Sequence, residues 1–248
     1  MKWLAGILSL IVLTGNARAQ FLPAGAPPTG FERFILTLFG GQPSFVASGT
    51  LHIQDANENN LANIACQIDA LGSNMFIQMN GFFPGSNAAP VANMMKEMRS
   101  SDILRPDLQR EYLVYPMFQS YVEMELTTKA PGGGEPYPHL SKLVLGKESL
   151  NGHDCQKSQW TVSDSQGAEQ KVMVWTENDL RNFPVVLKFP SSTNLVELDV
   201  SAVDFSPPPA TVFEVPAGYF KYEAIQSQIV SNVASQLTNA SNVVLLRK

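Results

Sequence analysis

The sequence predicts an α+β fold in which a curled antiparallel sheet of about eleven strands forms an unclosed half β-barrel, with helices capping its concave side. Three observations support this prediction. Apolar and polar residues alternate over most of the chain, short turn sequences join the alternating segments, and two or three segments with helical spacing interrupt them. Because so many strands rarely form a flat open sheet, we expect the sheet to curl toward a barrel.

The first nineteen residues have the order of a secretory signal peptide. Lys2 gives a positive start, Trp3 to Leu13 are mostly apolar, and Ala17-Arg18-Ala19 supplies small residues at the cleavage site. We therefore expect cleavage before Gln20 and a periplasmic or extracellular protein. The apolar stretch is too short to cross a bilayer core of about 30 Å, and we expect no transmembrane segment later in the chain.

The charge of the chain argues against a nucleic-acid partner. Seventeen basic and 22 acidic residues give a net charge of −5, and loss of Lys2 and Arg18 with the leader makes it −7. Nucleic acids require a basic surface.

We expect residues 20–30, rich in Pro, Ala and Gly, to be a flexible lead-in. Residues 31–223 are expected to form a single domain, and 224–248 a C-terminal helix and tail.

The first predicted element is a helix that begins at Phe31. Phe31, Phe34, Ile35 and Leu38 have the spacing of one helix face, and Gly40-Gly41 follows them. Since glycine is the usual residue just after a helix, we expect the helix to end there.

Eleven strands are predicted from apolar runs, most of which alternate with polar residues. The Asn151-Gly152 pair is the strongest hairpin signal, and Pro207 to Pro209 follow the last strand because proline cannot donate to a sheet. The predicted strands cover residues 45–53, 62–68, 75–79, a segment around 103, 112–115, 121–127, 142–150, 156–163, 170–176, 184–189 and 195–205.

Two further segments have helical spacing. One is 90–98, where Pro90 suits a first helical turn and the apolar residues are mostly methionine. The other is 222–237, where an apolar residue recurs every fourth position. We expect both to be helices.

Methionine and phenylalanine are concentrated between residues 75 and 98. Met is flexible and polarisable, so it suits surfaces that accept varied apolar ligands, but it also serves as packing material between a helix and a sheet. Both interpretations remain open at this point. The candidate wall of an apolar cavity consists of Met75, Ile77, Met79, Phe82, Met94, Met95 and Met98.

Motifs of catalysis and metal binding are scarce. His153-Asp154-Cys155 cannot form one catalytic set, because adjacent residues of an extended segment point to opposite faces. Glu123 and Glu125 share a strand face and could resemble a pair of catalytic carboxylates. Any two residues two positions apart in a strand share a face, however, and we expect both side chains to face solvent. The three histidines lie in separate elements, so we expect no metal and no cofactor.

The two cysteines, Cys66 and Cys155, leave two alternatives. An exported protein can form a disulfide between them. The other possibility is two separate thiols that pack as small apolar groups.

From Leu104 onward the chain contains a series of motifs in a fixed order. They include Leu104-Arg105-Pro106-Asp107, Tyr112-Leu113-Val114-Tyr115-Pro116, Ser120-Tyr121-Val122-Glu123-Met124, Asn151-Gly152-His153-Asp154-Cys155 and Val212-Phe213-Glu214-Val215-Pro216-Ala217-Gly218-Tyr219. This order is similar to that of an exported bacterial family grouped as a domain of unknown function, which resembles the LolA/LolB lipoprotein-carrier superfamily. The resemblance implies an unclosed antiparallel barrel with an apolar concave side capped by helices. In the carriers, the resulting cavity holds acyl chains of lipoproteins.

These observations favour an exported, non-enzymatic binding protein with an apolar cavity for a lipid, an acyl chain or a lipidated partner. The alternative is an envelope interaction or structural module whose barrel is filled by its own side chains. A hydrolase that uses Glu123, His153 or Cys155 is a third hypothesis. The sequence leaves the oligomeric state open.

Overall fold

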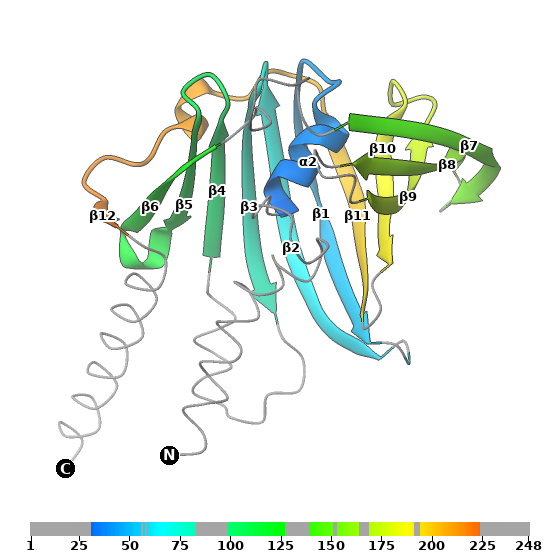
Figure 1. Ribbon diagram of the computed structural model, residues 1–248, viewed down its shortest axis with the longest axis horizontal. Helices are drawn as coiled ribbons and strands as arrows, with labels where there is room; N and C mark the ends of the chain where they lie inside the picture. The colour runs from blue at the N-terminus through cyan, green and yellow to red at the C-terminus, as the bar shows by residue number, and fades with distance from the viewer. Residues whose placement is uncertain are drawn as a thin grey trace, which may run out of the picture.

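The described part of the computed structural model comprises residues 31–55, 57, 59–82, 99–126, 139–150, 153–163, 169–190 and 194–223. It contains one sheet of twelve strands in the order β12-β6-β5-β4-β3-β2-β1-β11-β10-β9-β8-β7 (Figure 1). Neighbouring strands are antiparallel throughout, except that β12 runs parallel to β6. Since β12 and β7 lie at opposite edges, the sheet is curled but not closed.

The strand bounds are β1 Ser44–Asp55, β2 Asn60–Leu71, β3 Asn74–Phe82, β4 Arg99–Arg105, β5 Arg110–Tyr115, β6 Ser120–Glu125, β7 His139–Leu150, β8 His153–Ser163, β9 Glu169–Glu177, β10 Phe183–Pro190, β11 Asn194–Asp204 and β12 Phe220–Tyr222. The helical elements are α2 Phe31–Phe39 and two short 3-10 helices, η1 Pro116–Phe118 and η2 Ala210–Phe213.

Each of the eleven predicted strand segments overlaps one strand of the sheet. The predicted hairpin is confirmed by the pairing of Leu150 with His153, which flank the Asn151-Gly152 turn. The prediction missed β12, whose three residues are too few to show an alternating pattern. Tyr222 was therefore wrongly assigned to the start of a helix, whereas it ends this strand.

The predicted helix is confirmed as α2, which ends at Phe39, immediately before the predicted stop at Gly40-Gly41. Gly40 follows it directly, and a Cβ atom at this position would lie 2.6 Å from the carbonyl oxygen of Leu36. Any larger residue would therefore collide with the last turn of the helix, which explains why the helix ends at glycine.

The prediction of an α+β fold with several capping helices needs correction. The described residues are mostly β, and α2 is the α-helix among them. It lies over the concave side of the sheet (Figure 1). The other expected helices, at 90–98 and beyond 223, lie outside the described residues, as do the signal peptide and the lead-in.

A connecting segment crosses the outer side of the sheet between β11 and β12. Phe213 of η2 is buried there against Ile103 and Val114, and the Arg105 side chain donates to the Phe213 carbonyl oxygen at 3.2 Å. This contact explains how the chain reaches the far edge of the sheet and adds β12 beside β6.

Candidate ligand-binding face

Over β1, β2, β3, β9, β10 and β11 the concave side of the sheet is mainly apolar. Directly opposed residues on neighbouring antiparallel strands point to the same side, so the strand register defines this face. Leu51 of β1, for example, is opposite Ile64 of β2 and Leu198 of β11, and Leu198 is opposite Leu187 of β10. These residues belong to one core cluster, which draws on β1, β2, β3, β4, β8, β9, β10 and β11.

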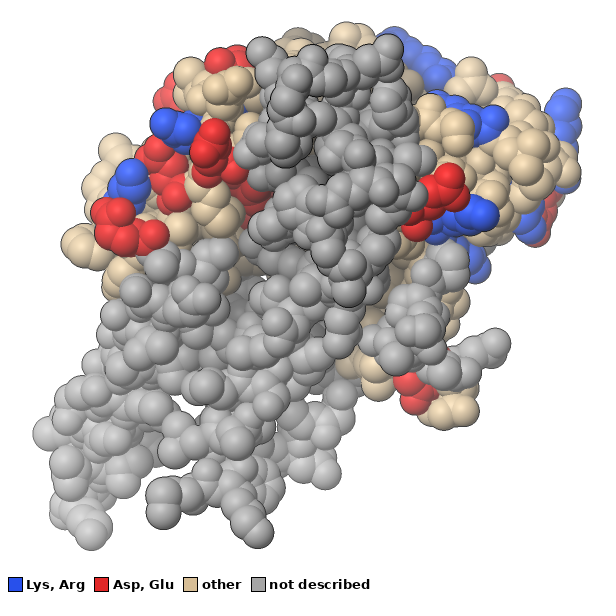
Figure 2. Space-filling model, in the orientation of Figure 1, with Lys and Arg blue, Asp and Glu red and all other residues tan. Residues whose placement is uncertain are grey.

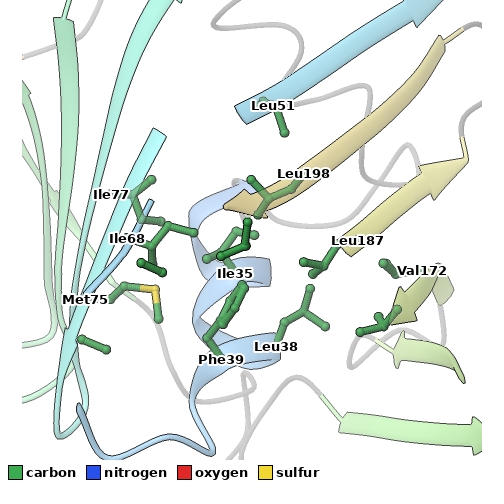
Figure 3. Packing of buried hydrophobic residues seen from close by; sticks show 14 of the residues in the cluster. Ile35, Leu38, Phe39, Leu51, Ile68, Met75, Ile77, Val172, Leu187 and Leu198 are labelled. Carbon is green, nitrogen blue, oxygen red and sulfur yellow. The ribbon is translucent and has the colours of Figure 1, made fainter. Parts of the chain in front are cut away.

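Helix α2 packs on this face with two of its predicted apolar residues, Ile35 and Leu38, and with Phe39, and all three side chains are almost completely buried. The side chains of Phe31 and Phe34 lie outside the described residues. Phe39, Phe45 and Phe183 form a ring cluster with centroids 4.9 to 5.7 Å apart. In Figure 3 the helix side chains lie among residues of several strands, namely Leu51, Ile68, Met75, Ile77, Val172, Leu187 and Leu198.

Three of the candidate wall residues lie on β3 and point to the concave face. Met75 and Ile77 are each 1% exposed and belong to the core cluster. Met79 is partly buried and packs against the same cluster. Their position agrees with both interpretations of the methionine-rich segment, as packing and as a wall, so their role in binding stays a prediction.

The remaining candidate wall residues are Phe82, Met94, Met95 and Met98. The backbone of Phe82 ends β3 opposite Asn63. The side chain of Phe82 and all of Met94, Met95 and Met98 lie outside the described residues.

The apolar face extends beyond α2. A nine-residue helix is about 14 Å long, whereas the twelve residues of β1 span about 40 Å. The side chain of Ile53, near the Asp55 end of β1, is only partly buried. The same holds for Cys66 and Met79, which lie at the level of Gly49 in the middle of β1, and for Leu140 of β7. We call these four partly exposed concave side chains the apolar margin.

A lysine that the sequence reading did not single out lies at one end of this margin. Lys142 on β7 is opposite Trp160 on β8, and its Nζ lies 3.8 Å from the centroid of the indole ring. Burial lowers the pKa of Lys142 from its usual value. The sequence places Leu140, Lys142 and Val144 at alternating positions, and this pattern indicates that the lysine shares a strand face with the two apolar residues.

The concave face becomes more polar at β4 and β5. Asp102 is opposite Leu113, and Glu111 is opposite Leu104. Both acidic residues are buried and point to the concave side with their apolar partners. Sequence reasoning also missed these two residues, because an acid in a strand normally indicates a solvent-facing position.

The two cysteines are free and lie on opposite faces of the sheet. Cys66 is opposite Met79 on the concave side, and burial raises the pKa of its thiol to about 11. Cys155 packs with Trp175 and Val186 on the outer side. Of the two alternatives from the sequence, the structure has the separate thiols.

The residues considered for hydrolysis lie on the outer side of the sheet. His153 Nδ1 is 2.6 Å from Glu177 Oε1, while Cys155 is 1% exposed and burial raises the pKa of its thiol. Because the thiolate is the reactive form, this cysteine is a poor nucleophile. Asp154 lies between His153 and Cys155 in the extended strand, so its side chain points to the opposite, concave face of the sheet.

As predicted, Glu123 and Glu125 also point outward, whereas Val122 and Leu126 are buried on the concave side. Glu123 accepts from Lys221 at 2.7 Å and pairs with Arg110 at 2.8 Å. The hydrogen bond from Lys221 lowers the pKa of Glu123. A carboxyl group held ionised in this way is unsuited to act as a general acid.

Within the described ranges, no group of three or more His, Cys, Asp or Glu side chains is arranged to hold a metal ion. In that same part of the chain, no helix combines the length and apolar character needed to cross a membrane.

No family model matches the chain, and no curated protein sequence matches it. Among solved structures, a LolA superfamily protein from Nitrosomonas europaea is 14% identical, covers 73% of this chain and 96% of its own, and has a TM-score of 0.36. The lipoprotein LppX of Mycobacterium tuberculosis is 10% identical over 71% of this chain and 94% of its own, with a TM-score of 0.39. A DUF1329 family protein from Desulfovibrio piger is 9% identical over 73% and 93%, with a TM-score of 0.36. The LolA superfamily, which the sequence motifs resemble, is thus among the structural neighbours of this chain.

Proposed function

We propose that this protein is an exported, non-enzymatic binding protein that holds a lipid, an acyl chain or a lipidated partner on the concave face of its sheet. The observation that carries the proposal is the partial exposure of four apolar side chains on the concave face, the apolar margin of Ile53, Cys66, Met79 and Leu140. An apolar chain laid against these side chains removes their exposed surface from water, which contributes about 25 cal/mol per Å² of apolar area.

The expected location follows from the sequence and belongs to the same proposal. Removal of residues 1–19 would release the protein into the periplasm or the medium, where acyl chains of membrane lipids and lipoproteins are potential ligands. The net charge of −7 after cleavage makes anionic membrane surfaces poor partners. We therefore place the attraction in the apolar face and not in the overall charge.

The direct test is a titration of the delipidated protein with a fluorescent fatty-acid probe. The variant Ile53→Asn places a polar amide in the apolar margin. Leu108→Asn is the matched control, because Leu108 is 51% exposed and lies between β4 and β5. We expect Ile53→Asn to weaken binding by about tenfold, and Leu108→Asn to leave it unchanged. No binding to the wild-type protein would overturn the proposal.

One observation favours a second candidate, an interaction or structural module with a filled interior. The middle of the concave face is filled by α2, and Ile35, Phe39, Phe45 and Phe183 there have no exposed surface. If packing of this kind extended over the whole face, no room for a ligand would remain. Native mass spectrometry of the purified protein separates the two candidates. A co-purifying apolar ligand supports binding, while a ligand-free mass together with failure to bind the probe supports the filled module.

A further inference from the structure

Strand β7 is a long edge strand with a free side. It has twelve residues, lies at the end of the strand order and, within the described ranges, pairs with β8 alone. Every residue from Ser141 to Ser149 is exposed. An edge strand carries a row of backbone N–H and C=O groups that no neighbouring strand satisfies. The free side of β7 therefore offers its hydrogen bonds to one kind of occupant, an extended polypeptide.

Three consecutive apolar residues of β7 are exposed to solvent, which is unusual unless the surface has a binding role. The exposed fractions are 58% for Leu143, 57% for Val144 and 50% for Leu145. Adjacent residues of a strand point to opposite faces, so Val144 points to the concave side and Leu143 to the outer side. A ligand on the concave face covers at most one of these two side chains. A strand added at the edge has side chains on both faces and covers both.

Two lysines flank this apolar run. Lys142 and Lys147 point to the concave side of β7, opposite Trp160 and Gln156 of β8. Among the described residues, neither lysine has a carboxylate within 4.0 Å, and the acidic residue of β7, Glu148, is paired with a lysine of β8 at 2.9 Å. Figure 2 shows Lys and Arg side chains beside tan surface on the right flank of the molecule, where Figure 1 places β7 and β8. The free edge is thus positively charged, although the whole chain is acidic.

The two lysines determine which strands can bind. Opposite charges on directly opposed residues of neighbouring strands stabilise the pairing, and like charges weaken it. A second copy of β7 would bring its own lysines to this edge, and lysine on an edge strand is a common device against self-association. A strand that places carboxylates opposite Lys142 and Lys147 is attracted instead. Charge complementarity therefore favours an acidic partner strand over a second copy of this chain.

The pairing with β8 indicates the spacing that such a partner needs. The register shift between Val144 and Gly146 leaves Leu145 without an opposite residue. Lys142 and Lys147, which are five positions apart, are consequently opposite residues of β8 that are four positions apart. A strand that follows the same path along the free side has its two carboxylates four positions apart and hence on one face. Apolar residues at the three positions between them then lie beside the exposed apolar run.

We propose that the free edge of β7 binds an extended segment of a partner protein by strand addition, and that this segment has an apolar centre flanked by acidic residues that pair with Lys142 and Lys147. The inference goes beyond the proposed function, because it needs no apolar ligand on the concave face. It adds a protein partner of stated chemistry to the ligand proposed above.

The test measures binding of fluorescent synthetic peptides to the mature protein by fluorescence anisotropy. The acidic probe is Thr-Glu-Val-Ile-Val-Glu-Thr, which reads the same in both directions and so can pair in parallel or antiparallel orientation. Replacing both glutamates gives the lysine peptide Thr-Lys-Val-Ile-Val-Lys-Thr, and replacing the central isoleucine by proline removes a backbone donor. We expect the acidic peptide to bind about tenfold more tightly than the lysine peptide. The proline peptide should not bind, because proline cannot pair within a sheet.

The variant Lys147→Glu reverses one charge on the free edge. Its matched control is Lys171→Glu, which changes the net charge equally at an exposed position of β9, across from Thr161. We expect Lys147→Glu to weaken binding of the acidic peptide about fivefold and Lys171→Glu to leave it unchanged. Thermal melts of both variants verify that the fold is intact. Hydrogen exchange of the β7 amides should slow when the acidic peptide is bound, because an added strand accepts hydrogen bonds from them.

Several results would overturn the proposal. They are equal binding of the acidic and lysine peptides, binding of the proline peptide as tight as that of the acidic one, unchanged exchange in β7, and no binding of any peptide. A dimer in analytical ultracentrifugation that Leu143→Asp converts to monomers would also overturn it, because the free edge would then bind a second copy. The fatty-acid titration tests the concave face separately, so either proposal can fail without the other.

Discussion

The indole of Trp175 on β9 donates from Nε1 to Oε2 of Glu148 on β7 at 3.0 Å, across the intervening strand β8. Lys157 of β8 contacts both partners, with its Nζ 2.9 Å from Glu148 and 4.9 Å from the centroid of the Trp175 ring. Lys188 of β10 lies 5.6 Å from the same ring and pairs with Glu197 of β11. These contacts connect five consecutive strands on the outer side of the sheet.

Replacing Trp175 with phenylalanine tests this connection. Trp175→Phe keeps an aromatic ring but removes the Nε1 donor, and we expect the melting temperature at pH 7 to fall by about 2–4 °C. Glu148→Gln retains an acceptor oxygen and should cause a smaller fall.

The effect of Trp175→Phe should depend on pH. The Trp175 hydrogen bond, followed by that of Lys157, lowers the pKa of Glu148 below its usual 4.5. The stability from this carboxylate is therefore present above pH 4.5 and is lost as pH falls through the lower folded-state pKa. Melting curves from pH 7 to pH 2 should show the wild-type and variant curves converging in acid. A constant difference would contradict the role of the ionised carboxylate.

Gly49 marks a place where β1 and β11 approach too closely for a side chain. A Cβ atom there would lie 2.2 Å from the carbonyl oxygen of Asp199, next to the register shift between Ser48 and Gly49. We expect Gly49→Ala to lower the free energy of unfolding by about 2–3 kcal/mol, because the two strands would have to separate. Gly41→Ala is the control, since no atom lies within 4 Å of a Cβ at that position. Equal denaturation midpoints for the two variants would contradict the close approach.

Asp69 is a buried acidic residue through which the stability of the fold should depend on pH. It is 2% exposed on the outer side, and desolvation raises its pKa even though Gln67 donates to both carboxylate oxygens, at 3.0 and 2.9 Å. The folded state therefore holds this proton more tightly than the unfolded chain does. Stability falls as pH rises from the usual pKa of 3.8 through the raised one.

We accordingly expect Asp69→Asn to be more stable than the wild-type protein at pH 7 and equally stable at pH 3. Urea unfolding at the two pH values measures this directly. A variant less stable than the wild type at pH 7 would show that the hydrogen bonds from Gln67 outweigh the desolvation of the carboxylate.

The state of the cysteines can be read from the mass of the intact protein. Because Cys66 and Cys155 point to opposite faces, we expect no disulfide even after export, and two thiols that react with maleimide in denaturant. In the folded protein the reaction should be slow, since Cys155 is 1% exposed and the Cys66 thiol has a pKa of about 11. A mass two hydrogens lower than that of the dithiol form would contradict the placement of the two side chains.

The alternation of apolar and polar residues predicted most of the strands of this fold. What it could not predict is how neighbouring strands pair. Phe45, Ala47 and Leu51 are buried on one side of β1 as expected, because a strand with one covered face must alternate. A register shift cannot be seen in such a pattern, and shifts occur in the pairing of β1 with both β11 and β2, of β7 with β8 and of β10 with β9. The face on which a distant residue such as Cys155 lies depends on these shifts and on the order of strands.

The candidate binding face was predicted in part. Met75, Ile77 and Met79 were selected from composition, and all three point to the concave side. Lys142 was missed because a lysine in a strand is normally assigned to solvent. Its contact with Trp160 depends on a pairing between two strands, which the sequence of neither strand specifies.

Photo-crosslinking with a photoreactive palmitate, followed by peptide mass spectrometry, tests the location of the ligand most directly. We expect labels on the concave residues of the apolar margin, above all Ile53, Met79 and Leu140, and we expect these labels to be lost when unlabelled palmitate competes. Competable labels confined to outer-side residues such as Thr161 and Lys171, or no competable label at all, would contradict the central claim that the concave face binds the apolar chain.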